Sequence, residues 1–105
     1  MISKTEVTRK KMIRGAIIEV LHKSQSAPLP VKTLELHLMT GGFDPSGELI
    51  PAINYLCDRG YIRAIDDGDA DINPYRGMSV RLTADGQDVY EHTKEDPGLL
   101  FCRED

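Results

Sequence analysis

One segment, residues 57–91, constrains the fold of this 105-residue chain more than any other. Gly60 ends a run with helical periodicity and suits the left-handed residue that commonly follows a helix. Two runs with strand-like alternation come next, at residues 61–66 and 78–82, and the polar stretch between them is rich in Asp and Gly, as long turns are. The pattern predicts an antiparallel hairpin that leads into a helix over about residues 84–93.

Three helices are predicted ahead of this hairpin, over about residues 8–23, 31–39 and 46–59. Pro51 lies inside the third run, where it would kink a helix interior. We therefore expect this helix to start near Gly47, which places Pro51 near the first turn. In the first helix the apolar residues recur at spacings of three and four, which puts them on one face. They are Ile13, Ala16, Ile17, Val20 and Leu21.

Three fragments carry a family resemblance. They are PLPVKTLELHL at the second predicted helix, LIPAINYLCDRGYIRA across the third, and VRLTADGQDVYE with its Leu82-Thr83-x-x-Gly86 pattern. Over residues 9–93 the chain resembles the winged helix-turn-helix proteins of the ArsR- and MarR-like architecture. It is also similar to small uncharacterised winged-helix proteins of Mu-like phages and prophages, which share its length and its Asp-Pro-Gly tail.

The resemblance implies a mainly α fold with a small β-hairpin, in the order α-α-α-β-β-α. Whether Leu29 adds a further very short strand is left undecided. It also implies a transcriptional regulator of phage or bacterial origin that binds double-stranded DNA. In similar folds the first and last helices form a homodimer interface, which the tail of this chain could reinforce. Thr83 is the expected N-cap of the last helix.

The chain is long enough for one domain with a single core. We divide it into an N-terminal arm (1–8), a winged-helix domain (9–93) and a C-terminal tail (94–105). The apolar Leu99, Leu100 and Phe101 predict that the tail docks, either on this domain or on a partner chain. Neither a run of about 18 apolar residues nor an apolar signal region occurs, so we expect a cytoplasmic protein without a membrane span.

Charge is unevenly distributed along the chain. Residues 1–24 hold six basic and two acidic side chains, and the remainder holds seven basic and fifteen acidic ones. Such a basic region either meets nucleic acid or is simply the solvated face of a helix. In a winged helix, the third helix reads base edges and the wing contacts phosphates. The candidate nucleic-acid-binding residues are therefore Arg9, Lys10, Lys11, Arg14, Asn54, Tyr55, Arg59, Arg63, Arg76 and Arg81.

Acidic residues oppose the DNA-binding interpretation. Glu48 and Asp58 would approach a polyanion from the third helix, where carboxylates are repelled. The predicted hairpin tip adds Asp66, Asp67, Asp69 and Asp71. The alternative is a protein–protein interaction module on the same scaffold, such as a phage accessory protein that binds no DNA, because one fold hosts many functions.

A calcium site is not predicted at the hairpin tip. The spacing of Asp67, Asp69 and Asp71 matches the start of a calcium-binding loop. However, Ile72 and Met78 stand where that loop requires Gly and Glu. The motif fails at both diagnostic positions.

The histidines and cysteines predict no metal, cofactor or catalytic site either. His22, His37 and His92 lie on three different predicted helices without paired spacing. Cys57 and Cys102 lack metal-ligand spacing, and without a secretion signal we expect no disulfide between them. No pattern of nucleophile and base stands out, so we expect no enzymatic activity.

Overall fold

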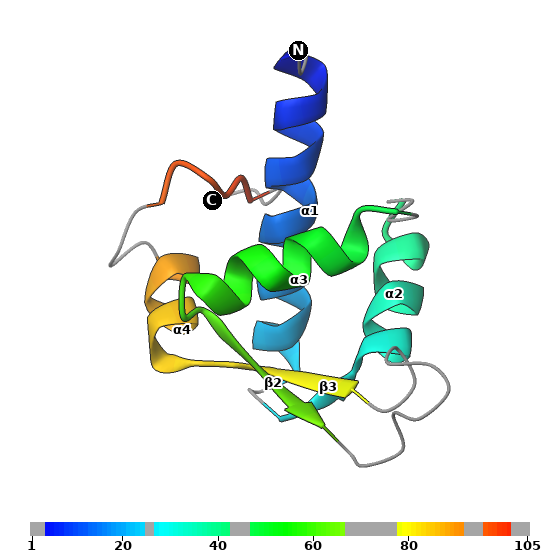
Figure 1. Cartoon of the computed structure of the whole chain (residues 1–105), viewed down its shortest axis with the longest axis vertical. Helices are drawn as coiled ribbons and strands as arrows, with labels where there is room; N and C mark the ends of the chain where they lie inside the picture. Colours follow the sequence, from blue (N-terminus) through cyan, green and yellow to red (C-terminus); the bar gives the residue numbers. More distant parts are fainter. Residues whose placement is uncertain (1–3, 25–26, 43–46, 67–77, 92–95, 102–105) are drawn as a thin grey trace.

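The computed structural model describes residues 4–24, 27–42, 47–66, 78–91 and 96–101. It is mainly helical, with a small antiparallel sheet of strand order β1-β3-β2 (Figure 1). The order of elements confirms the expected α-α-α-β-β-α, and the short strand left open at Leu29 is present. The elements are α1 (Lys4–Lys23), β1 (Leu29–Pro30), α2 (Val31–Thr40), α3 (Leu49–Asp58), β2 (Ile62–Asp66), β3 (Met78–Leu82) and α4 (Ala84–Tyr90).

α1 runs through the middle of the molecule and contacts α2, α3, α4 and β3 (Figure 1). Ile13, Ile17 and Leu21 of the predicted apolar face are fully buried. Ile18, outside that face, is equally buried, whereas Ala16 is only half-buried. The prediction of a single apolar stripe was too narrow, because neighbouring elements cover α1 on several sides.

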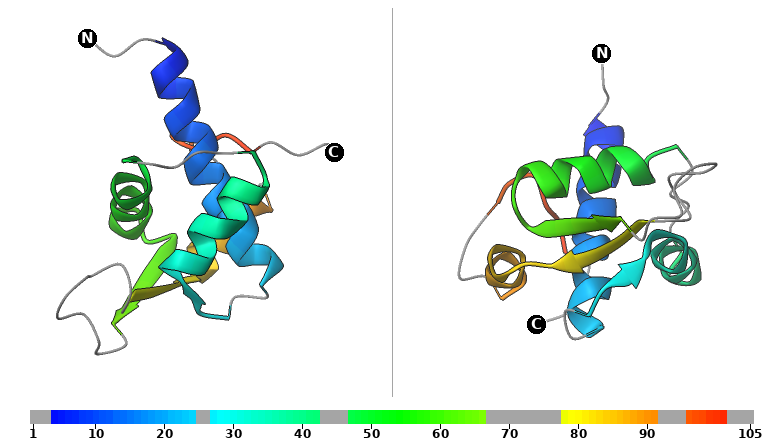
Figure 2. Two further views of the ribbon diagram at one scale, coloured as in Figure 1. Left: turned by 90° about the vertical axis from the view of Figure 1, so that its right-hand side faces the viewer. Right: turned by 60° about the horizontal axis from the view of Figure 1, so that its bottom comes forward.

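The start of α1 differs from the prediction. The helix begins at Lys4 instead of about Thr8, so residues 4–8 continue α1 and do not form a separate arm. Its first turns stand clear of the other elements (Figure 2), and the side chains of residues 5–9 are exposed. No Gly or Pro occurs before Gly15 to stop the helix, so it extends beyond the part that tertiary packing requires.

α3 begins at Leu49, which places Pro51 in its first turn, as expected. Gly60 follows the helix with a φ of 79°, in the left-handed region, which confirms its predicted role. The chain then turns directly into β2, and the Tyr61 N–H donates to the Leu56 carbonyl oxygen over 3.0 Å. The sheet is thereby fixed to the end of α3.

β2 and β3 form the predicted antiparallel hairpin, in a register that pairs Ile62 with Leu82 and Arg63 with Arg81. Ile62 and Leu82 are buried against the helices, and both arginines are exposed. The hairpin tip, residues 67–77, lies outside the described residues. Arg76 and the aspartates weighed for calcium lie there too.

Thr83 is the N-cap of α4, as predicted, and its hydroxyl accepts from the Gly86 N–H over 3.1 Å. α4 ends at Tyr90, before the predicted end near residue 93, and residues 92–95 lie outside the described part. A Cβ added at Gly86 would collide with the Tyr61 carbonyl. Only glycine therefore lets α4 approach the turn between α3 and β2 so closely. Among the described helices, none has the length and apolar character that crossing a membrane would require.

Candidate nucleic-acid interface

α3 separates two groups of candidate residues. One group lies toward α1, and the other lies on the β2–β3 hairpin; Asn54 is exposed on the outward face of α3 between them. The α1-side group consists of Arg9, Lys10, Lys11, Arg14, Tyr55 and Arg59, and the hairpin group consists of Arg63 and Arg81.

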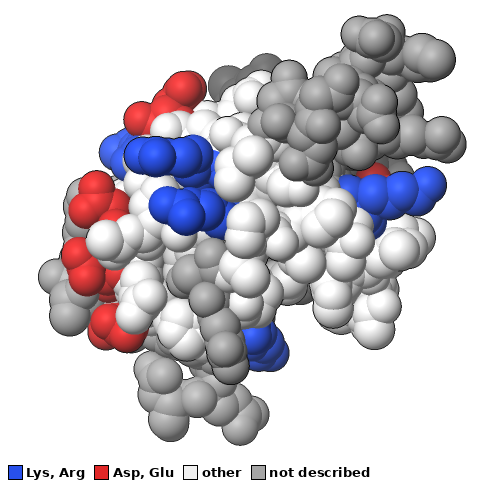
Figure 3. Space-filling model, turned by 90° about the horizontal axis from the view of Figure 1, so that it is seen from below, with Lys and Arg blue, Asp and Glu red and all other residues white. Residues whose placement is uncertain are grey.

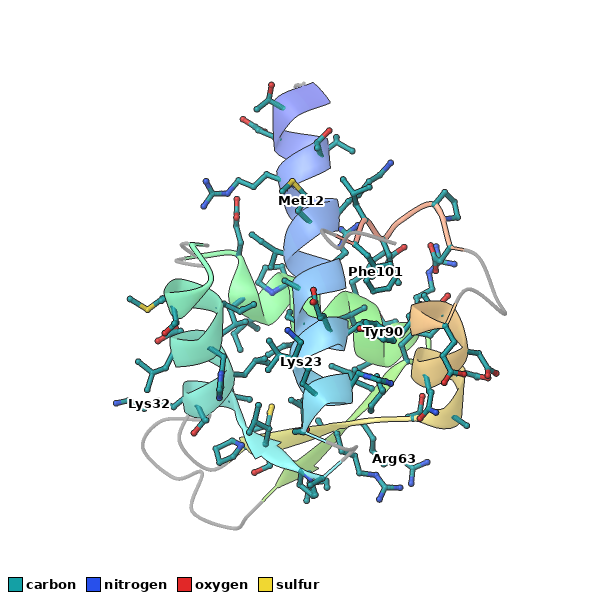
Figure 4. The ribbon with its side chains drawn as sticks, turned by 180° about the vertical axis from the view of Figure 1, so that it is seen from behind. Met12, Lys23, Lys32, Arg63, Tyr90 and Phe101 are labelled. Carbon is teal, nitrogen blue, oxygen red and sulfur yellow. The ribbon has the colours of Figure 1, made fainter. Side chains whose placement is uncertain are left out.

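The hairpin group is a pair of arginines directly opposite each other on antiparallel strands. Side chains in such positions have Cβ atoms about 4.5–5.5 Å apart, and like charges there destabilise the sheet. Both side chains are exposed, and neither makes an ion pair or side-chain hydrogen bond with another described residue. Arg63 projects from the sheet on the side away from the helices (Figure 4). Among the described residues, the pair therefore concentrates positive charge that no neighbouring carboxylate compensates.

The surface around the arginine pair carries both basic and acidic side chains. Seen from below, basic side chains gather over the hairpin, and acidic side chains line the adjacent edge (Figure 3). The exposed acidic residues of the neighbouring α4 segment are Asp85, Asp88 and Glu91. The basic area is thus local and does not extend over the whole face.

The outward face of α3 carries the exposed Pro51, Asn54 and Asp58. Asn54 is exposed as its candidate role requires, and Asp58 places a carboxylate beside it. Glu48, the second carboxylate expected to repel a polyanion, forms an ion pair with Arg9 (2.9 Å between Arg9 Nε and Glu48 Oε2). This pair is partly exposed and contributes little stability, but it reduces the repulsion from Glu48 and engages Arg9.

Tyr55, a candidate nucleic-acid-binding residue, is not fully exposed, because the C-terminal tail folds back over it. Its ring is half-buried beneath Arg14, whose guanidinium carbon lies 3.8 Å from the ring centroid, within cation–π range. The Arg14 Nη1 also donates to the carbonyl oxygen of Gly98 over 3.2 Å. Arg14 and Tyr55 therefore hold the tail and are not free surface groups.

Asp96 is the centre of this contact, and its side chain is only 2% exposed. The carboxylate accepts a hydrogen bond from the Tyr61 hydroxyl, one from the Gly98 N–H (2.7 Å) and a long one from the Tyr55 hydroxyl (3.5 Å). The Arg59 Nη1 lies 3.8 Å from Asp96 Oδ2. A buried carboxylate thus joins α3, the start of the hairpin and the tail.

These contacts shift two ionisation equilibria. Burial alone would raise the pKa of the Asp96 carboxyl, but the hydrogen bonds it accepts and the nearby Arg59 charge hold that pKa below its ordinary value. Burial, and then the hydrogen bond to Asp96, raises the pKa of the Tyr61 hydroxyl to about 12. Asp96 is therefore ionised and Tyr61 protonated at neutral pH.

Sequence reasoning missed the role of Asp96, although a signal was present. An Asp followed by Pro-Gly commonly accepts a backbone hydrogen bond two residues on, and Asp96 accepts this bond from Gly98. That pattern indicates a tight turn at the tail. It does not indicate which helix the turn contacts.

Residues 96–101, called the tail segment below, dock on the same chain. Leu99 is buried, and the Leu100 N–H donates to the Lys11 carbonyl oxygen over 3.1 Å. A Cβ added at Gly15 would collide with the Leu100 carbonyl, so the tail backbone lies directly on α1. Phe101 meets the edge of Tyr90, with ring centroids 5.7 Å apart (Figure 4).

The histidines and cysteines of the described part do not gather into a site. His22 stacks on Tyr90, with ring centroids 4.1 Å apart, and no group of three or more metal-ligating side chains occurs among the described residues. Cys57 is a free, half-buried thiol whose pKa is raised by burial. His92 and Cys102 lie outside the described residues.

Comparison with known proteins adds no relative: no protein-family model, curated protein or solved structure matches this chain.

Proposed function

We propose that this chain is a winged helix-turn-helix protein that binds double-stranded DNA, with α3 in the major groove and the β2–β3 hairpin as its wing. The order of the elements and the direct passage from α3 into the hairpin support the winged-helix assignment. The observation that carries the proposal is the Arg63–Arg81 pair.

The arginine pair fits a phosphate-bearing partner on energetic grounds. Two like charges held opposite each other across a sheet destabilise it. A DNA backbone would remove this penalty, and each neutralised phosphate would release condensed counterions. Arginine suits the task because its planar guanidinium donates in parallel to phosphate oxygens.

Asn54 supplies the means to read sequence. It is exposed on the outward face of α3. An asparagine in the major groove can donate and accept simultaneously at the edge of an adenine. The proposal therefore assigns base readout to Asn54 and phosphate contacts to Arg63 and Arg81.

The test compares Arg63→Gln and Arg81→Gln with Lys32→Gln, each of which removes one positive charge. Lys32 is exposed on α2, away from Arg63 (Figure 4). Fluorescence anisotropy with a mixed-sequence duplex, across a salt series, measures both affinity and salt dependence. Each hairpin variant is expected to lower the magnitude of the salt slope by about 1, while Lys32→Gln leaves it unchanged. Absence of binding at low salt, both by the wild-type protein and by the variants with a released tail described below, would refute the proposal.

A second candidate function is a protein-interaction module. Leu36 and Met39 are each 54% exposed, and they are neighbours on the surface of α2 because they lie three residues apart. Binding of a partner protein that persists after nuclease treatment, and that the Leu36→Ser, Met39→Ser double variant loses, would support this function. Recovery of nucleic acid alone would count against it.

The homodimer expected through α1, α4 and the tail remains a prediction. The tail segment already occupies part of the α1 surface, so a dimer would have to form around it. Light scattering after size-exclusion chromatography gives the mass in solution.

A further inference from the structure

We propose that the tail segment is an intramolecular inhibitor of DNA binding, which when docked withholds Arg14, Tyr55 and Arg59 from the DNA backbone beside α3. This inference rests on the proposed DNA binding and names a means of regulating it. Release of the segment would expose Arg14 and Tyr55 on the α1 side of α3, opposite the hairpin arginines, and would free the already exposed Arg59 from its ion pair with Asp96.

The withheld residues lie where a DNA strand would pass. Tyr55 directly follows the exposed Asn54 on α3, and Arg59 follows the last residue of that helix. Arg14 lies against the Tyr55 ring from the α1 side. A helix placed in the major groove has a sugar–phosphate backbone along each flank, and these three residues line one of them.

The tail segment offers these residues the same chemistry as a phosphate. The Gly98 carbonyl oxygen accepts from Arg14, and the Asp96 carboxylate faces Arg59 and accepts from the Tyr55 hydroxyl. Carbonyl and carboxylate oxygens here occupy donors that phosphate oxygens use in protein–DNA contacts. The segment and a DNA strand therefore compete for the same donors.

Docking depends on close fit at a few points near the chain end. A Cβ at Gly98 would collide with the Tyr55 hydroxyl, and one at Gly15 would collide with the Leu100 carbonyl. Leu99 is buried, but Leu100 is 42% exposed. A segment with so few buried side chains can open while the helices stay packed.

Gly98→Ala is the first test, because the added Cβ would displace the Tyr55 side chain and so weaken docking without changing any charge. Hydrogen exchange at the Leu100 amide, which is bonded to the Lys11 carbonyl in the docked state, reports release directly. Circular dichroism checks that the helices remain. Anisotropy with the mixed-sequence duplex then gives the affinity at low salt.

Asp96→Asn is the second variant, used in case Gly98→Ala does not release the segment. Because it also removes a negative charge, it is compared with Glu35→Gln, which makes the same charge change on α2, away from the tail contacts. Any general electrostatic gain appears equally in both variants.

Release is expected to raise DNA affinity at least about tenfold at low salt and to steepen the salt slope by about 1–2, since it frees two cations for phosphates. Glu35→Gln is expected to change affinity less than twofold. If the tail amide exchanges freely and affinity is unchanged or weaker, the inhibitor proposal fails while DNA binding stands. If neither the wild type nor the released variants bind the duplex, both proposals fail.

Discussion

On the α1 side of α3, Arg14 and Arg59 each meet an oxygen acceptor supplied by the tail segment. On the hairpin side, Arg63 and Arg81 face each other, and neither is paired with another described residue. Within the described residues, the chain thus gives one set of cations internal acceptors and holds the other set beside a like charge. Surface charge that opposes folding stability indicates a binding role more strongly than charge that supports it.

The largest expected effect comes from removing the acceptor on the α1 side. Asp96→Ala removes the carboxylate that accepts from the Tyr61 hydroxyl and the Gly98 N–H, so the free energy of unfolding should fall by about 2–3 kcal/mol. Urea denaturation measures this, with Glu35→Ala on α2 as the control. A change below about 0.5 kcal/mol is typical of a surface substitution. Such a result would mean that the acceptor on the α1 side does not stabilise the fold, and that the two sides of α3 do not differ in stability.

An intermediate effect is expected at high pH. The pKa of Tyr61 is raised to about 12 in the folded protein. The protonated hydroxyl therefore contributes stability that is complete below the ordinary tyrosine pKa and is lost as pH rises toward the folded-state pKa of about 12. Stability should therefore decline above about pH 10, with tyrosinate absorbance rising in the same transition. Tyr61→Phe should flatten this part of the stability profile. An unchanged profile in that variant would assign the alkaline transition to another group.

Acid conditions test the hydrogen bonds around Asp96 through the carboxyl group instead of the Tyr61 hydroxyl. The pKa of Asp96 is lowered in the folded protein, so its stabilisation is present above the ordinary aspartate pKa and is lost as pH falls through the folded-state value. Wild-type stability should drop more steeply in acid than that of Asp96→Asn. Parallel acid profiles of the two proteins, measured by thermal unfolding, would contradict this expectation.

The smallest expected effect has the opposite sign. Replacing Arg81 with threonine removes the repulsion from Arg63 and introduces a residue that suits strands, so stability should rise by about 0.2–1 kcal/mol. Thermal unfolding at low salt detects this gain, and added salt should diminish it by screening the wild-type repulsion. A loss of stability would show that the arginine pair is held by favourable contacts after all.

Local signals predicted most of the fold, and contacts distant in sequence account for most of the errors. Gly60, Thr83 and the position of Pro51 each act within one turn, so their roles follow from residue type. The burial of Ile18 does not, because it depends on what surrounds the helix. The extension of α1 to Lys4 has a local cause, because no Gly or Pro stops the helix before Gly15.

The candidate site was predicted only in part, for the same reason. Asn54, Arg63 and Arg81 are exposed, as their assigned roles require. Arg14 and Tyr55 are engaged with the tail, a contact that joins residues 84 positions apart in the case of Arg14 and Gly98. No periodicity or spacing rule reaches across that distance.

The central position of α1 also has a consequence for synthesis on the ribosome. α1 is synthesised before α4 and the tail segment, so its contacts with them can form only after both have emerged. Until then Ile18 and its neighbours lack part of their cover, and early exposure of apolar helix faces favours aggregation. Translation speed over the codons for α4 and the tail segment should therefore affect how much folded protein accumulates.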